Sequence, residues 1–400
     1  MTAKVSMPIL FVSLFIVMLG FGIVLPIMPF YVSHFGASGK ELGLMMAIYS
    51  FMQFLCAPVW GRWSDRVGRK PVLLIGLTGF AFAFALMGLA QDIVQLILAR
   101  ALAGILSSAA LPAVYAYIGD TTAQHERSQG MGMLGAAMGL GMIFGPLLGG
   151  PLGKIALPLP FFAAAGFAVI ALSFAYVKLG ESLPPEQRAG HHATGVPTQP
   201  RVWRDVFRGT MGFLMLTSFL LAFALANFEA VLGLFAKDRY ALEPDQVGYL
   251  LGVFGVLGAI QQGVLMGPLA RKFGDVRILQ GGLLVSTVGF VGSAAINNLG
   301  WFIFFSALFN FGNALLRPSV SALISQRAAM GQGAAMGLNN STQSLGRTVG
   351  PLWAGSVYDV HLEYPFYTGA LIQAVAFSIS LFAIHEHAQP NATPIGKTNE

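Results

Sequence analysis

Twelve apolar segments of membrane-spanning length, separated by short polar connections, dominate this 400-residue chain. A helix needs about 20 apolar residues to cross the hydrocarbon core of a bilayer. The segments that meet this length are residues 7–32, 42–61, 71–90, 93–117, 129–152, 159–178, 210–236, 247–268, 278–296, 300–324, 332–357 and 365–385. Because backbone polar groups inside a bilayer need partners within the protein, the pattern predicts an all-α membrane protein with twelve transmembrane helices.

The composition argues against a soluble protein. Only 10% of the residues are charged, against about 25% in a soluble globular domain. The single cysteine, Cys56, rules out an internal disulfide and a cysteine-based metal cluster. The adjacent His191 and His192 have no cysteine or carboxylate cluster nearby, so we expect no metal site. The net charge of +6 comes from basic residues in particular connections, so the expected partner is the lipid bilayer and not nucleic acid.

The basic residues are unevenly divided between the two sides of the predicted membrane. Sixteen of the 23 Lys and Arg residues fall in connections on one side, four fall on the other, and three lie within spans. Short loops rich in Lys and Arg stay in the cytoplasm. The bias therefore predicts that both termini are cytoplasmic. It also supports the count of twelve spans, because one missing helix would move every later connection to the other side of the membrane and remove the bias.

A hydrophilic stretch in the middle of the chain separates two halves. Residues 181–208 include "ESLPPEQRAGHHATGVPTQP", which is rich in Pro, Gly and charge and predicts a cytoplasmic linker. The segments on either side, 1–180 and 209–400, each contain six predicted helices, and the second ends in a short cytoplasmic tail.

The two halves are related by an internal repeat. "GRWSDRVGRK" begins at Gly61 and "GPLARKFGDV" begins 206 residues later, so that Gly68 aligns with Gly274. Pro112 and Pro318 are also 206 residues apart. A duplicated six-helix unit whose halves face each other across a central site is typical of transporters. We therefore expect two pseudo-symmetric six-helix bundles.

One carboxylate, Glu229, lies deep within a predicted span, in "LANFEAVLGLF". The other sixteen acidic residues lie in connections, in tails or near span ends. An acid in the membrane interior is costly and usually functional. Because low dielectric favours the neutral acid, Glu229 could load and release a proton near physiological pH. Its counterpart at the repeat offset is Ile23, so the halves are not chemically equivalent.

The connection "GRWSDRVGRKPVL" resembles the cytoplasmic signature of the major facilitator superfamily, G-x-x-x-D-R-x-G-R-K/R. The matching residues are Gly61, Asp65, Arg66, Gly68 and Arg69. The resemblance implies that Asp65 faces the start of the eleventh helix and that Arg69 binds an acid at the end of the fourth, where Asp120 stands. Both contacts would close the cytoplasmic side. A generic basic loop would explain the arginines but not Asp65 or the glycine spacing.

Two further motifs carry the same resemblance. "LILARALAGILSSAALP" resembles the family's fourth-helix motif, whose intramembrane arginine, here Arg100, is assigned to proton coupling. The alternative is an arginine that reaches the membrane surface. "GLGMIFGPLLGG" resembles the fifth-helix signature of the family's antiporters, and its residues are Gly141, Gly145, Pro146, Gly149 and Gly150. The alternative is a kinked packing helix that says nothing about the direction of transport.

The first-helix stretch "LGFGIVLPIMPFY" extends the resemblance to twelve-helix drug:proton antiporters, including bacterial multidrug and quinolone exporters. Those exporters place an essential glutamate in the seventh helix, where Glu229 stands, and an acid in the tenth helix, where this chain has none. The resemblance implies a proton-coupled antiporter, not an enzyme, that exports amphipathic, often cationic, small molecules across the bacterial inner membrane. "GGPLGKI" lacks the spacing of a nucleotide-binding loop, so we expect the proton gradient as the energy source and no cofactor.

Polar residues within the spans are candidates for a substrate cavity between the halves, which we expect to be rich in aromatic side chains. They are Gln53, Asn227, Asn310, Asn313, Asn340 and Arg347. Alternatively, Arg347 forms a fixed ion pair with Glu229 that only holds two helices together. We expect the chain to work as a monomer. Two other functions stay open, namely transport of one defined metabolite such as a sugar, and a sensor or scaffold that transports nothing.

Overall fold

The computed structural model describes residues 3–122, 127–184, 188, 209–327 and 332–383, and all regular structure in these ranges is helical. The N-terminal half contains α1 (Ala3–Val24), α2 (Met28–His34), α3 (Gly39–Val67), α4 (Arg69–Leu89), α5 (Ile93–Ser107), α6 (Ala110–Thr121), α7 (Arg127–Ile155) and α8 (Leu159–Lys178). The C-terminal half contains α11 (Gly209–Tyr240), α12 (Pro244–Ile260), the π-helix η1 (Gln261–Leu265), α13 (Met266–Ala295), α14 (Leu299–Arg327), α15 (Gln332–Tyr358) and α16 (Tyr364–Ala383). The predicted all-α fold is confirmed. Most of the predicted linker 181–208, with His191 and His192, lies outside the described residues.

Each of the twelve predicted spans coincides with helical structure. Among the described residues, ten helical segments are long and apolar enough to cross a membrane. One of them, Pro244–Ala295, holds two predicted spans that meet at Gly274. α15 is not one of the ten, because its first half is polar and includes the run from Asn339 to Ser344.

The repeat is visible in the backbone at two glycines. Gly68 lies between α3 and α4 with φ 111°, and its counterpart Gly274 interrupts α13 with φ 76°. Positive φ is nearly free of strain only for glycine. Each glycine lets one span turn directly into the next, so the sequence alignment of the halves corresponds to the same turn in both.

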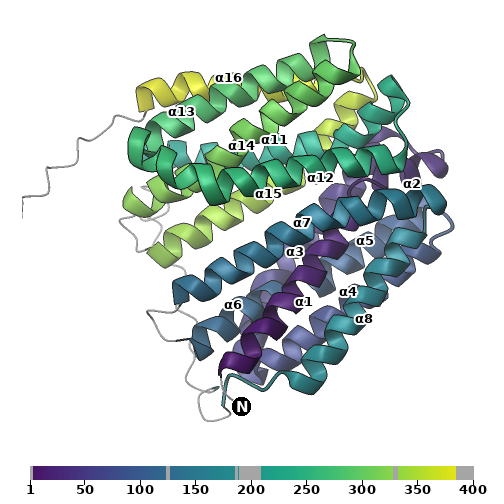
Figure 1. Ribbon diagram of the computed structural model, residues 1–400, viewed down its shortest axis with the longest axis vertical. Helices are drawn as coiled ribbons and strands as arrows, with labels where there is room; N and C mark the ends of the chain where they lie inside the picture. Colours follow the sequence, from purple (N-terminus) through teal and green to yellow (C-terminus); the bar gives the residue numbers. More distant parts are fainter. Residues whose placement is uncertain (1–2, 123–126, 185–187, 189–208, 328–331, 384–400) are drawn as a thin grey trace, which may run out of the picture.

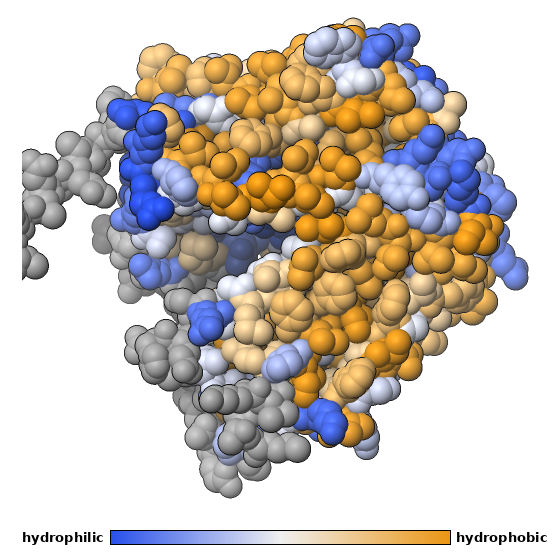
Figure 2. Space-filling model, viewed as in Figure 1, coloured by the Kyte–Doolittle hydropathy of each residue, from blue (hydrophilic) through white to orange (hydrophobic). Residues whose placement is uncertain are grey.

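The molecule has two distinguishable ends, and we name them from their residues. The basic end holds the turns at Gly68 and Gly274 and the exposed Arg62, Arg66 and Arg271. It lies at the left and the bottom left of Figure 1. The opposite end holds the connections after α2, α7, α11 and α15. On the face shown in Figure 2, orange, hydrophobic residues cover much of both halves between these ends, as expected for a surface that faces lipid.

The two halves contact each other mainly through two helix pairs, α3 with α15 and α7 with α12. These contacts lie toward the opposite end. At Gly248 of α12, an added Cβ would lie 2.5 Å from the carbonyl oxygen of Pro146 in α7. Nearer the basic end, an added Cβ at Gly139 of α7 or Gly258 of α12 would meet nothing within 4 Å. The halves therefore diverge toward the basic end, as the ribbon also shows (Figure 1).

Many of the aromatic residues form the interior of the C-terminal half. The rings of Phe290 and Phe309 lie 4.2 Å apart and those of Phe228 and Phe309 lie 4.4 Å apart, measured between centroids. Phe366 joins the same group from α16. All four side chains are almost fully buried. They hold α11, α13, α14 and α16 together behind the surface that faces the other half.

Candidate functional site

A cavity of about 550 Å³ lies between the two halves, where they diverge. Its lining comes from α1 and α7 of the N-terminal half and from α11, α12, η1, α14 and α15 of the C-terminal half. A smaller cavity of about 120 Å³ shares Glu229, Met142 and Asn310 with it and reaches Pro146 and Leu251. In the space-filling view a hollow with blue, hydrophilic residues separates the halves near the basic end (Figure 2).

The N-terminal half lines the cavity with small and flexible apolar residues. They are Met18, Gly135, Met138, Gly139 and Met142. Methionine is unbranched and polarisable, so it adapts to ligands of different shape. The expectation of a cavity rich in aromatic residues is wrong, because Phe254 is the one aromatic lining residue of the larger cavity and many other rings pack inside the C-terminal half.

The C-terminal half lines the same cavity with polar residues, many of them on one face of α14. They are Asn310, Asn313, Ala314, Arg317, Pro318 and Ser321, spaced three, four, seven, eight and eleven residues from the first. This spacing places them on one helical face. Gln262, Asn340 and Gln343 add polar groups from η1 and α15. The predicted cavity residues Asn310, Asn313 and Asn340 are therefore among the residues that line this cavity.

The three other predicted cavity residues, Asn227, Gln53 and Arg347, lie outside the cavity lining, and Arg347 is described with Arg317 below. Asn227 is fully buried, and its side-chain amide donates to the carbonyl oxygen of Pro365 at 2.8 Å, which ties α11 to the start of α16. Gln53 on α3 is half-buried and does not line the cavity. The prediction was wrong for all three because polarity alone does not tell which helical face a residue occupies.

Glu229 is the one acidic residue that lines the cavity. It is half-buried on α11, and about 11 residues, or ~16 Å, separate it from the end of that helix. Arg317 and Arg347 are near enough for their charges to act on it. In the described part of the chain, however, neither arginine forms an ion pair with it. A fixed Glu229–Arg347 pair is therefore not present in this structure.

The two arginines are held by α15. Arg347 is half-buried, does not line the larger cavity, and donates to the hydroxyl of Ser344 at 3.1 Å. Arg317 lines the cavity and donates to the side-chain oxygen of Gln343 at 3.3 Å. Arg317 was not among the predicted cavity residues. Its spacing of four residues from Asn313 and seven from Asn310 was the signal that would have placed it on their helical face.

A π-helical turn, η1, interrupts the helix beside the cavity. Within it, Gln261 is buried and its side chain donates to the carbonyl oxygen of Phe311 on α14, while Gln262 is exposed to the cavity. Short π-helical turns occur often at functional sites. Successive side chains of a helix point about 100° apart, so the two neighbouring glutamines face different surfaces.

The residues of the predicted antiporter motif close the cavity toward the opposite end. Gly141, Gly145 and Gly149 pack against the backbone of α1. Gly150 instead faces the other half, where an added Cβ would lie 2.7 Å from the carbonyl oxygen of Pro244. Pro146 lines the smaller cavity. The motif thus contacts one helix of its own half and one helix of the other.

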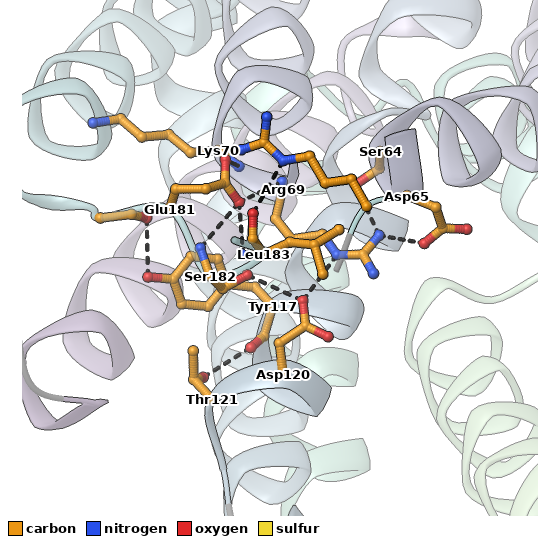
Figure 3. A network of polar contacts seen from close by, with 12 residues as sticks. Ser64, Asp65, Arg69, Lys70, Tyr117, Asp120, Thr121, Glu181, Ser182 and Leu183 are labelled. Atoms are coloured by element: carbon orange, nitrogen blue, oxygen red, sulfur yellow. Dashed lines mark hydrogen bonds and ion pairs between the residues drawn. The ribbon is translucent and has the colours of Figure 1, made fainter. Parts of the chain in front are cut away.

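A charged cluster occupies the basic end of the N-terminal half (Figure 3). Arg69 is 4% exposed and binds Asp65 at 2.5 Å and Asp120 at 2.9 Å. Asp120 also accepts from Ser182 at 3.1 Å. Glu181 accepts from the backbone N–H groups of Arg69 at 2.8 Å and Lys70 at 3.2 Å, and so caps α4.

This cluster joins α3, α4, α6 and the segment after α8 within one half. The resemblance placed Asp120 correctly as the partner of Arg69. Among the described residues, Asp65 forms its ion pair with Arg69, and no hydrogen bond or ion pair joins it to α15, so the expected latch between the halves is not seen among them. The remaining motif residues, Gly61 and Arg66, are half-buried and exposed, respectively.

Arg100 lies inside the N-terminal half and does not reach the membrane surface. It is 1% exposed. Its guanidinium lies over the ring of Tyr49, 4.4 Å from the centroid, and 5.9 Å from that of Phe21. Nε and Nη1 have no hydrogen-bond partner among the described residues. A buried, incompletely paired charge is costly, and this one is stabilised mainly by contact with aromatic faces.

The sequence matches one family model and several proteins named for drug resistance. A family model described as Major Facilitator Superfamily matches residues 10–264 and 214–399. Multidrug resistance protein 1 of Bacillus subtilis is 30% identical over 94% of this chain and 96% of its own length. Quinolone resistance protein NorA of Staphylococcus aureus is 26% identical over 90% of this chain and 91% of its own.

The fold also matches solved structures. A bacterial homologue of the human lysosomal transporter Spinster, in an inward-facing and occupied conformation, superposes with a TM-score of 0.79 over 94% of this chain and 96% of the other. The two sequences are 13% identical, so this likeness concerns the fold alone.

Proposed function

Since the chain belongs to the Major Facilitator Superfamily and is a multi-pass membrane transporter, we propose that it exports amphipathic small molecules in exchange for protons. The relatives named for multidrug and quinolone resistance support export of drugs as the physiological role. We assign the basic end to the cytoplasm of a bacterial inner membrane, with both termini on that side, because Lys and Arg concentrate there. The mechanism needs one copy of the chain and no cofactor.

In this orientation the structure represents the state that receives substrate. The cavity opens where α7 and α12 diverge, and it is closed toward the outside where Gly150 and Gly248 pack backbone against backbone. An amphipathic molecule would enter from the cytoplasm or the inner leaflet. Its apolar part would contact the methionines of the N-terminal half and its polar part the residues of α14.

Glu229 would couple this movement to protons. As a carboxylate it favours a cationic group in the cavity, and as a neutral acid it does not. When the cavity opens outward, protonation of Glu229 would therefore promote release of the substrate. A proton that moves inward releases about 2.3 kcal/mol per 100 mV of membrane potential, which can drive export without nucleotide hydrolysis. The observation that carries this proposal is that Glu229 is the one acid lining the cavity and has no ion-pair partner among the described residues.

The test is export by Glu229→Gln in proteoliposomes with an imposed pH gradient. We expect the variant to bind substrate but to lose gradient-driven transport by at least about tenfold, because a neutral amide cannot carry a proton. Asp238→Asn, at the end of the same helix and outside the cavity lining, is the matched control. Gradient-driven export at the wild-type rate by Glu229→Gln would disprove the coupling role. Transport of only one metabolite from a broad panel would favour a dedicated carrier, and no substrate-dependent proton flux at all would favour a sensor.

A further inference from the structure

Arg317 places a positive charge in the cavity in addition to the acidic side chain of Glu229. Both are lining residues, and they are the two charged residues in the lining. Arg317 is exposed to the cavity. Arg347 contributes a second positive charge close by, since it and Arg317 both act on Glu229. With Glu229 ionised, the polar side of the cavity therefore carries a net positive charge, which a purely cationic substrate does not complement.

The two charged residues, Glu229 and Arg317, lie at different positions along the axis of the cavity. Asn310 and Glu229 line both the larger and the smaller cavity, so both face the region that the two cavities share. Arg317 follows Asn310 by seven residues on α14, a rise of ~10 Å toward the basic end. The acid thus lies at the closed, inner part of the cavity and the arginine nearer its mouth. This rise separates the two backbone positions along the cavity, while the charges of Arg317 and Glu229 stay near enough to act on each other.

Arg317 also keeps unused hydrogen-bonding capacity. A guanidinium has five N–H donors, and the described contact of Arg317 is the bond to Gln343. Tyr115 of α6, which belongs to the other half and is outside the cavity lining, is near enough to interact electrostatically with it. Asn313 adds an amide nitrogen that is buried and has no hydrogen-bond partner among the described residues. Donors on α14 are therefore available to a ligand that accepts hydrogen bonds, and a planar carboxylate fits a guanidinium in two-point contact.

Resting on the export function proposed above, we infer that the preferred substrates are amphipathic zwitterions, whose carboxylate binds Arg317 while their cationic group faces Glu229. The methionine surface of the N-terminal half covers the apolar body between these groups. Arg317 is in this view the residue that selects for an anionic group. Proton uptake by Glu229 weakens only its contact with the cationic group of the substrate. The contact between Arg317 and the carboxylate of the substrate does not depend on this proton, and it orients the substrate during loading.

A matched pair of dyes tests this assignment. A rhodamine free acid is a zwitterion at neutral pH, and its methyl ester is a cation with the same ring system. Binding of each dye to the purified protein in nanodiscs is followed by fluorescence anisotropy, and export is followed in proteoliposomes with a proton gradient. We expect the wild-type protein to bind the acid about tenfold more tightly than the ester, as a charge-assisted bond predicts.

Arg317→Gln should weaken binding of the acid by about tenfold and change binding of the ester less than about twofold. Arg317→Lys keeps the charge but not the planar fork, so it should restore part of the preference. The exposed Arg271 at the basic end provides the control Arg271→Gln, which should leave both affinities unchanged. A thermal unfolding scan of each variant verifies that it is folded.

The outcomes separate the two proposals. Equal weakening of both dyes by Arg317→Gln, or no preference for the acid in the wild type, overturns the role of Arg317 while export of the ester still supports the proposed function. Absence of gradient-driven export of either dye, and of a wider set of amphiphiles, overturns the proposed function itself. If Arg317→Gln fails to fold, the wild-type preference and the Arg317→Lys variant still decide the question.

Discussion

The carboxylate of Asp359 accepts hydrogen bonds from the backbone N–H groups of Gly39, at 2.7 Å, and Lys40, at 2.9 Å. Asp359 follows α15 of the C-terminal half, whereas Gly39 and Lys40 begin α3 of the N-terminal half. The first N–H groups of a helix lack partners within it and favour a negative charge. An acid from one half therefore caps a helix of the other and joins them at the closed end.

Asp359→Asn should weaken this closure. The amide keeps the shape but loses the charge, which should cost about 1 kcal/mol of the closed state and raise the outward-open population roughly fivefold. Spin labels at the exposed His34 and Val360, in a Cys56→Ser background, would report the distance between the halves. Asp92→Asn is the matched control, because Asp92 caps α5 of its own half through Gln95 at 2.8 Å. An unchanged distance distribution would show that the cap does not hold the halves together.

Gly248→Ala should interfere with closure at the same end. The added methyl would lie 2.5 Å from the carbonyl oxygen of Pro146, a backbone atom that cannot rotate away. We expect gradient-driven transport to fall at least about tenfold while the protein still inserts and folds, because α7 and α12 belong to different halves. Gly281→Ala, where an added Cβ meets nothing within 4 Å, should transport normally. Comparable transport by the two variants would contradict the need for this close approach.

Arg69→Gln should destabilise the N-terminal half. Arg69 is buried and serves both Asp65 and Asp120, so its removal leaves two carboxylates without their partner. Both acids are partly exposed, so we expect a loss of about 2 kcal/mol, below the 3–5 kcal/mol typical of a fully buried pair. A thermal unfolding scan in detergent measures it, with Arg66→Gln at a neighbouring exposed position as control. Equal melting temperatures of the two variants would show that the cluster contributes little stability.

The span pattern, the repeat and the deep acid could all be predicted from the sequence, because each depends on local hydropathy or spacing. Helix length and polarity locate each span, although the helices extend beyond several of the predicted bounds. The positive φ at Gly68 and Gly274 is consistent with glycine's freedom to turn. Glu229 was recognisable because a carboxylate in a long apolar run is costly unless it faces a cavity.

The faces of the helices could not be predicted in the same way. Asn227 and Asn310 are both polar residues within spans, yet one binds the carbonyl of Pro365 and the other lines the cavity. Which of these applies depends on how neighbouring helices pack. For the same reason Arg317 was not predicted as a cavity residue, although it lies on the same face of α14 as Asn313. The motif resemblance identified Asp120 as the partner of Arg69 but not the state of the gate, because that contact lies within one half.

Arg100 offers a test that separates function from stability. It is 1% exposed, and two of its nitrogens have no hydrogen-bond partner among the described residues. A charge held in this way costs the fold free energy, and such costs usually persist where function requires them. Arg100→Gln should therefore leave the melting temperature unchanged or raise it, while gradient-driven transport falls at least about tenfold. Tyr49→Leu, which removes the aromatic face 4.4 Å from the guanidinium, should lower the melting temperature because it takes away the main contact of the charge. If Arg100→Gln instead unfolds the protein and restoring stability restores transport, the arginine is a structural element of the N-terminal half and takes no part in coupling.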